Sequence, residues 1–332
     1  MNRSIQSSKG HVTAASKSVV TKGNSAAGAA NGPEEREVVL STRDVSLALL
    51  FRRHSSTMRI VDFRAGPSER KRQAVLEVAK REGVEKVFTL VERDEVATWI
   101  RLGFQKEATI PGFYKRSDAY LVGSPTESAL RAGPARVGGE PDVFEDEDDG
   151  SEEESDLSSR TNDADRTLYQ SKKLLRDLKS TSPVKLSEVS KEEAELAHSR
   201  AKGKRTLTSF EQFGRDVVRR YFLARSKGFE LALSVESQTC FSNAFLEVAW
   251  APGTPGETQL FSTSLRLLND LLQKEGTVSC FALCPVDDIS FAAVFLANGF
   301  RKTGVLQAHV QIGKERKDAI LFSRKLANPL AD

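Results

Sequence analysis

Few residues of this chain combine a reactive side chain with the spacing that catalysis needs. Glu247 and Glu236 each lie inside an apolar, strand-like run, and His309 could act as a base, although we expect a surface position for it. No Ser/His/Asp or Cys/His arrangement suits nucleophilic catalysis, and the Gly-Lys-Ser/Thr loop that binds phosphates is absent. The sequence therefore offers isolated carboxylates rather than a ready-made catalytic motif.

The composition of the 332-residue chain narrows its class. Hydrophobic residues make up 39%, and no apolar run approaches the ~20 residues that cross a bilayer, so we expect a globular protein without a membrane partner. Three Cys and four His argue against a zinc cluster, and we expect no metal. Cys280 and Cys284 share one predicted strand but lie about 13 Å apart, too far for a disulfide. Cysteines that do not form a disulfide indicate a reducing, cytoplasmic location for the protein.

Charge and composition divide the chain into segments. The net charge is +3, yet residues 140–156 hold eleven acids and no base, which predicts a mobile linker. We expect four parts: a disordered basic tail at 1–34, a first ordered module at 35–124, an acidic flexible linker at 125–182, and a complete second module at 183–328.

The two ordered modules share an internal repeat. In each module a helical stretch ends at a glycine, and a phenylalanine lies five residues after that glycine in an apolar strand. A second helical stretch then runs into Gly-Phe, and the module closes with Asp-Ala-x-Leu. These features are Gly83, Phe88, 103–104 and 118–121 in the first module and Gly276, Phe281, 299–300 and 318–321 in the second. The repeat predicts an α/β fold with a mixed sheet, in which 245–251 and 278–284 are central strands.

The second module resembles the GNAT family of N-acetyltransferases. Residues 245–252 are similar to its central strand, 253–258 to its acyl-CoA loop and 291–300 to its late aromatic motif. The resemblance implies a tandem copy with a degenerate N-terminal half, acetyl-CoA as co-substrate, and acyl transfer to the amine of a small molecule or protein by direct attack. It also implies that Glu247 is the general base, with Glu236 a weaker candidate. The implied cofactor-binding residues are Ala251, Gly253, Gly256, Glu257 and Thr258.

Several residues depart from the family pattern. Pro255 replaces a basic residue of the loop and lacks an N–H. Phe295 and, in the first module, Trp99 occupy the place of a proton-donating tyrosine, and we expect both in the core. These departures support an alternative, in which the chain is a catalytically inactive, GNAT-like module for regulation or protein interaction. For the basic stretch 200–227, an amphipathic helix pair is favoured over a nucleic-acid face.

Overall fold

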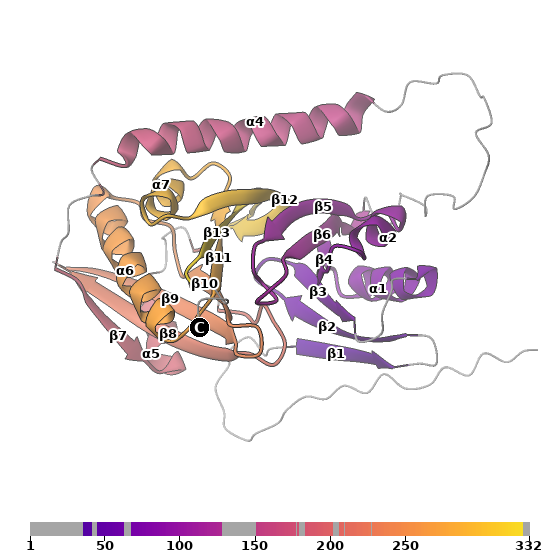
Figure 1. Ribbon diagram of the computed structural model, residues 1–332, viewed down its shortest axis with the longest axis horizontal. Helices are drawn as coiled ribbons and strands as arrows, with labels where there is room; N and C mark the ends of the chain where they lie inside the picture. Colours follow the sequence, from indigo (N-terminus) through magenta and orange to yellow (C-terminus); the bar gives the residue numbers. More distant parts are fainter. Residues whose placement is uncertain are drawn as a thin grey trace, which may run out of the picture.

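The computed structural model describes residues 36–41, 45–62, 68–127, 151–176, 178, 183–201, 206–208, 210–226 and 228–327. The tail at 1–34 and most of the acid-rich run at 140–156 lie outside these residues. The described strands form one 13-stranded sheet in the order β1-β2-β3-β4-β6-β5-β12-β13-β11-β10-β9-β8-β7 (Figure 1). Parallel and antiparallel pairs both occur, which confirms the expected mixed α/β class.

Each half of the sheet is contiguous in the chain. The first half contains β1 (Arg36–Ser41), β2 (Ser46–Arg52), β3 (Thr57–Asp62), α1 (Glu69–Arg81), β4 (Lys86–Val91), α2 (Val96–Arg101), β5 (Gln105–Ile110) and β6 (Ala119–Pro125). Helix α4 (Ser151–Leu174) follows. The second half contains β7 (Lys185–Val189), α5 (Lys191–Arg200), β8 (Val218–Ser226), β9 (Phe229–Gln238), β10 (Asn243–Val248), α6 (Pro255–Lys274), β11 (Ser279–Pro285), α7 (Ile289–Ala297), β12 (Arg301–Ile312) and β13 (Glu315–Lys325).

One strand order occurs twice. It is β1-β2-β3-β4-β6-β5 in the first half and β8-β9-β10-β11-β13-β12 in the second, with β7 added outside β8. In each half the central pair is parallel, β3 with β4 and β10 with β11, and a helix connects the two strands. The two glycines that follow α1 and α6 have φ angles of 65° and 82°, a region that suits glycine after a helix end (Gly83 and Gly276).

The repeated Asp-Ala-x-Leu pattern has a structural reason. The Asp118 carboxylate accepts a hydrogen bond of 2.8 Å from the Gly112 N–H in the turn between β5 and β6. The Asp318 carboxylate accepts one of 2.7 Å from the Ala308 N–H of β12. Each aspartate therefore fixes the backbone that precedes it in its own closing hairpin.

The two halves of the sheet join edge to edge at Gly304. This residue of β12 pairs with Ala108 of β5, and an added Cβ would lie 2.3 Å from the Ala108 Cβ and from the Glu107 carbonyl oxygen. Beside this contact, the buried Lys86 ammonium donates to the Glu107 carboxylate and to the Gln307 carbonyl oxygen. Only glycine lets the backbones approach this closely, so Gly304 positions one half against the other.

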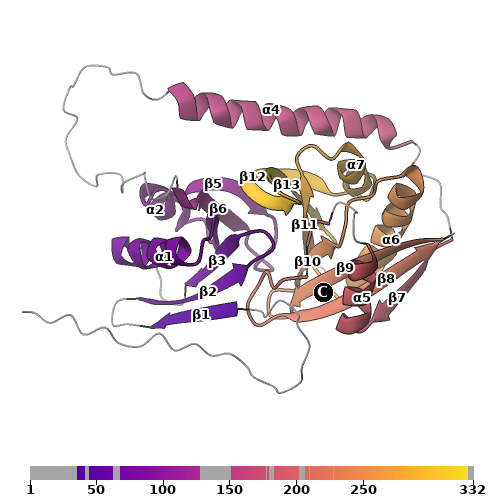
Figure 2. The same cartoon turned by 180° about the vertical axis from the view of Figure 1, so that it is seen from behind.

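Helix α4 forms within residues 125–182, where we expected an acidic flexible linker. It runs beside α7 and β12 in both views (Figures 1 and 2). Ala164 and Ser171 are fully buried, and the Ser171 hydroxyl donates to the Ile289 carbonyl oxygen at 2.8 Å. The second half of α4 buries small side chains against α7, and this packing stabilises the helix. The many charged residues of the segment did not indicate such a buried face. No helix in the described part of the chain has the length and apolarity to span a bilayer.

The predicted helix pair at 200–227 is wrong. Residues 218–226 form strand β8, and the described residues of 206–217 form a non-helical segment. Phe210 and Phe213 are only 2% and 3% exposed within this segment. Phe210 and Phe213 are three positions apart, which matches helical spacing, but here a loop buries them against the sheet. Local periodicity does not distinguish a buried loop from an amphipathic helix.

Candidate functional site

The central strands of the second half separate at the site. Pairing between β10 and β11 ends at Leu246 and Ala282, although the strands continue to Val248 and Pro285. A small pocket with a cavity volume of about 30 Å³ lies at this point. We call it the boundary pocket; its polar lining residues are Arg52, His54, Ser55, Thr208, Glu211, Glu247 and His309. This volume holds about two water molecules.

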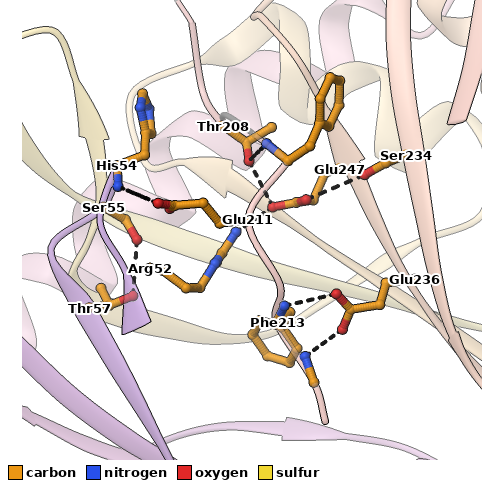
Figure 3. A network of polar contacts seen from close by, with 12 residues as sticks. Arg52, His54, Ser55, Thr57, Thr208, Glu211, Phe213, Ser234, Glu236 and Glu247 are labelled. Atoms are coloured by element: carbon orange, nitrogen blue, oxygen red, sulfur yellow. Dashed lines mark hydrogen bonds and ion pairs between the residues drawn. The ribbon is translucent and has the colours of Figure 1, made fainter. Parts of the chain in front are cut away.

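Glu247 lines the boundary pocket, and Figure 3 shows its polar contacts. Its Oε1 atom pairs with the Arg52 guanidinium and accepts from the Thr208 hydroxyl at 3.0 Å, and its Oε2 atom accepts from the Ser234 hydroxyl at 3.3 Å. Burial raises the pKa of Glu247, while the cations Arg52 and Arg219 oppose that rise. Both carboxylate oxygens are thus engaged by the protein itself.

The first half of the chain supplies one side of the boundary pocket. Arg52 ends β2, and the turn that follows it brings the His54 backbone N–H to both oxygens of Glu211, at 2.9 and 3.0 Å. Arg52 and Glu247 are 195 positions apart in the sequence. Sequence reasoning missed Arg52, His54 and Glu211, because no local pattern connects a turn of one half to a strand of the other.

Glu236 lies next to the pocket but has another set of contacts. Its carboxylate accepts from the backbone N–H groups of Phe213, at 2.8 Å, and Gly214 (Figure 3). It also pairs with the Arg219 guanidinium at 2.7 Å. The buried Arg59 guanidinium donates to the Phe213 carbonyl oxygen at 2.9 Å. Glu236 therefore fixes the segment that carries Phe213 and Glu211.

His309 is buried, contrary to the expected surface position. It is 0% exposed, and neither ring nitrogen has a hydrogen-bond partner among the described residues. Its ring meets Phe88 of the first half edge-on at 4.8 Å. Burial, followed by the cations Lys86, Arg52 and Arg316, holds the pKa of His309 well below its ordinary value, so the ring is neutral at pH 7.

The loop between β10 and α6 carries the expected cofactor-binding residues. Thr254 caps α6 by accepting from the Glu257 N–H, and the Glu257 carboxylate returns to accept from the Gly253 N–H at 2.9 Å. An added Cβ on Gly256 would lie 2.6 Å from the Phe229 ring, so that ring covers the glycine. Ala251 is buried, and the Thr258 hydroxyl donates to the Thr254 carbonyl oxygen.

The contact between Glu257 and Gly253 affects how this loop could hold an anion. The helix N-terminus and the Gly253 N–H suit a pyrophosphate, but the Glu257 carboxylate now accepts from that N–H. The Glu257 carboxylate therefore occupies a backbone donor that an incoming anion would use. Among the described residues, no group of three His, Cys, Asp or Glu side chains could hold a metal ion.

The two aromatic residues at the tyrosine places belong to the core, as expected. Phe295 is 0% exposed and stacks on Phe322 at 5.0 Å, and Trp99 is 3% exposed and meets Phe104 edge-on. Neither residue lines the boundary pocket. Proton transfer in the boundary pocket would therefore need a residue other than Phe295 or Trp99.

Comparison with known proteins found similarity only among solved structures. No family model and no curated protein matches the chain. The ribosomal-protein-S18-alanine N-acetyltransferase of Escherichia coli aligns over 44% of this chain and 95% of its own, with 16% identity and a TM-score of 0.34. A spermidine N-acetyltransferase from Vibrio cholerae aligns over 45% and 96%, with 14% identity and a TM-score of 0.37. A ribosomal L7/L12 alpha-N-protein acetyltransferase in complex with coenzyme A aligns over 44% and 95%, with 15% identity and a TM-score of 0.36.

Proposed function

We propose that the second half of the chain is an acetyltransferase module that takes acetyl-CoA as acyl donor and an amine as acceptor. The observation that carries this proposal is the separation of β10 and β11 after Leu246 and Ala282, which opens a polar pocket beside Glu247. In this arrangement the acyl group would lie between the two strands and the amine would attack it directly. The acceptor is the amine of a small molecule or a protein, and the reaction takes place in the cytoplasm.

The chain's own residues would bind the donor at the start of α6. Ala251, Gly253, Gly256 and Thr258 would lie around the pyrophosphate, and the helix dipole would favour its charge. The Thr258 N–H already donates to the Thr254 carbonyl oxygen, so Gly253 and Gly256 would supply the backbone N–H groups. Acetyl-CoA would supply an activated acyl carbonyl. Glu257 opposes this binding, because a like charge about 4 Å away costs roughly 4 kcal/mol at an effective dielectric constant of about 20.

The first half is, in this proposal, a degenerate copy of the same module. It repeats the strand order and the parallel central pair, but residues 63–67, between β3 and α1, lie outside the described residues. Its contribution to the second half is the turn after Arg52, which closes one side of the boundary pocket.

A second candidate function is a catalytically inactive module for regulation or assembly. The protein's own groups support it: Glu257 accepts from the loop N–H of Gly253, Phe229 covers Gly256, and Arg52 pairs with Glu247. In this case the repeated fold serves to present surfaces to a partner, and acetyl-CoA would not bind.

Calorimetric titration of the full chain with acetyl-CoA distinguishes the two functions. We expect wild type to bind and Glu257→Gln to bind at least tenfold more tightly, because the substitution removes the charge and keeps a hydrogen-bonding side chain. Glu275→Gln, at the other end of α6, makes the same change of net charge and should leave the affinity unchanged. Gly256 is a poor position for this test, since any side chain there meets Phe229. Absence of binding at millimolar acetyl-CoA in both wild type and Glu257→Gln would refute the acetyltransferase and leave the inactive module.

A further inference from the structure

The environment of His309 needs an explanation. A buried ring nitrogen without a hydrogen bond costs free energy, and in His309 both nitrogens lack a partner among the described residues. The side chain also lines the boundary pocket, whose volume of about 30 Å³ admits water or the end of a small ligand. These nitrogens are therefore placed to bind something that enters the pocket.

The backbone of β12 is distorted where it carries this histidine. The pairing of β12 with β13 shifts register between Leu306 and Val310, and Ala308 has a φ of 45°, which is costly for a residue with a Cβ. Two charged side chains stabilise the distortion: Asp318 accepts from the Ala308 N–H at 2.7 Å, and the Arg316 Nε donates to the Ala308 carbonyl oxygen at 2.6 Å. Bulges of this kind redirect a side chain next to functional sites.

The carboxylates that line the pocket already accept hydrogen bonds from the protein, whereas His309 has none among the described residues. Glu247 is bound through both oxygens, to Arg52 and Thr208 on one side and to Ser234 on the other. The Glu211 carboxylate accepts from the His54 backbone N–H, and the His54 ring has a backbone hydrogen bond with Gln311, so that Nε2 is its one ring nitrogen without a partner among the described residues. Of the ionisable groups that line the pocket, His309 is the one in which no side-chain nitrogen has a hydrogen-bond partner among the described residues, and both of its nitrogens are buried.

We propose that His309 binds the acceptor amine in the boundary pocket and accepts its proton, in a site that both halves of the chain complete. This proposal rests on the proposed acetyltransferase function. The amine nitrogen bonds to the acyl carbon as the carbon–sulfur bond breaks. The proton that leaves the nitrogen passes to a ring nitrogen of His309 and then, through pocket water, to the departing thiolate, so that an amide and a thiol are formed. A neutral ring is ready for this step at pH 7.

The activity test compares wild type with His309→Gln, a polar variant of similar size. With ethylamine as the probe acceptor and acetyl-CoA as donor, we expect kcat/KM to fall at least 100-fold, in the range that general-base catalysis contributes. The affinity for acetyl-CoA should change less than twofold. His198→Gln, on α5 outside the pocket lining, serves as the matched control and should retain full activity.

A spectroscopic test does not depend on turnover. In the full chain with ring-15N histidine, ethylamine should shift the His309 signals in a saturable way, and Arg52→Met should weaken that response because it removes a polar group that lines the pocket. Normal acetyl transfer by His309→Gln, or His309 signals unmoved by 50 mM ethylamine, would overturn this assignment alone. Failure of both wild type and Glu257→Gln to bind acetyl-CoA would instead overturn the proposed function.

Discussion

The ion pair between Arg52 and Glu247 should contribute strongly to the stability of the chain, because it connects the two halves at a buried position. Each side chain is only 6% exposed. Replacing Arg52 with Met keeps most of the volume but leaves the Glu247 carboxylate without its direct partner. Breaking a buried pair by removing one member costs about 3–5 kcal/mol. Arg219 also acts on Glu247, so we expect the lower end, about 3 kcal/mol.

Thermal unfolding followed by circular dichroism measures this effect. A loss of 3 kcal/mol corresponds to a drop in Tm of about 6–12 °C for a unit of 150–250 residues. The double variant Arg52→Met/Glu247→Gln should recover part of the loss, since no charge is then left unpaired. Lys191→Met, which breaks the exposed pair with Glu195, should change the stability by less than about 1 kcal/mol.

Two results would refute this reasoning. A drop below about 2 °C for Arg52→Met would mean that water or Arg219 compensates the carboxylate. A double variant whose loss equals the sum of the single losses would mean that Arg52 and Glu247 do not act as a pair.

Three further predictions follow from the junction, from α4 and from the buried histidine. Gly304→Val should cost about 2–3 kcal/mol or more in urea unfolding, because its side chain would overlap Ala108 of the other half; unchanged stability would show that the halves do not meet at this point. Ala164→Glu should release α4 from α7, so limited proteolysis should cleave within 151–176 before the sheet, and resistance equal to wild type would contradict the packing. The pKa of His309 in the folded state lies below the ordinary 6.5. The unfolded chain therefore binds more protons at this residue, and the free energy of unfolding should fall as the pH drops from about 6.5. The fall for this residue is at most about 1.4 kcal/mol per pH unit. His309→Gln should flatten that slope in urea titrations between pH 7 and 5, although His54 retains a part of it, and an unchanged slope would show that the ring titrates normally.

Local sequence signals predicted the later elements of each half of the chain. Apolar strands, helical stripes and the glycines that end helices predicted β4, β11, α7 and the closing hairpins, because these signals depend on residues within a few positions of one another. Strand β11 lies one residue from its predicted bounds, and β10 begins two residues and ends three residues before its predicted bounds. The same local signals identified Glu247 and the loop before α6.

Only the tertiary structure decided what surrounds those residues. Arg52 reaches Glu247 from 195 positions away, and His309 is buried because β12 carries a bulge and meets the first half of the chain. The helical spacing of Phe210 and Phe213 was misleading, since Glu236 and Arg59 hold that segment as a loop. Long-range contacts of this kind depend on how the two halves of the sheet pack together, and they leave no periodic pattern in the chain.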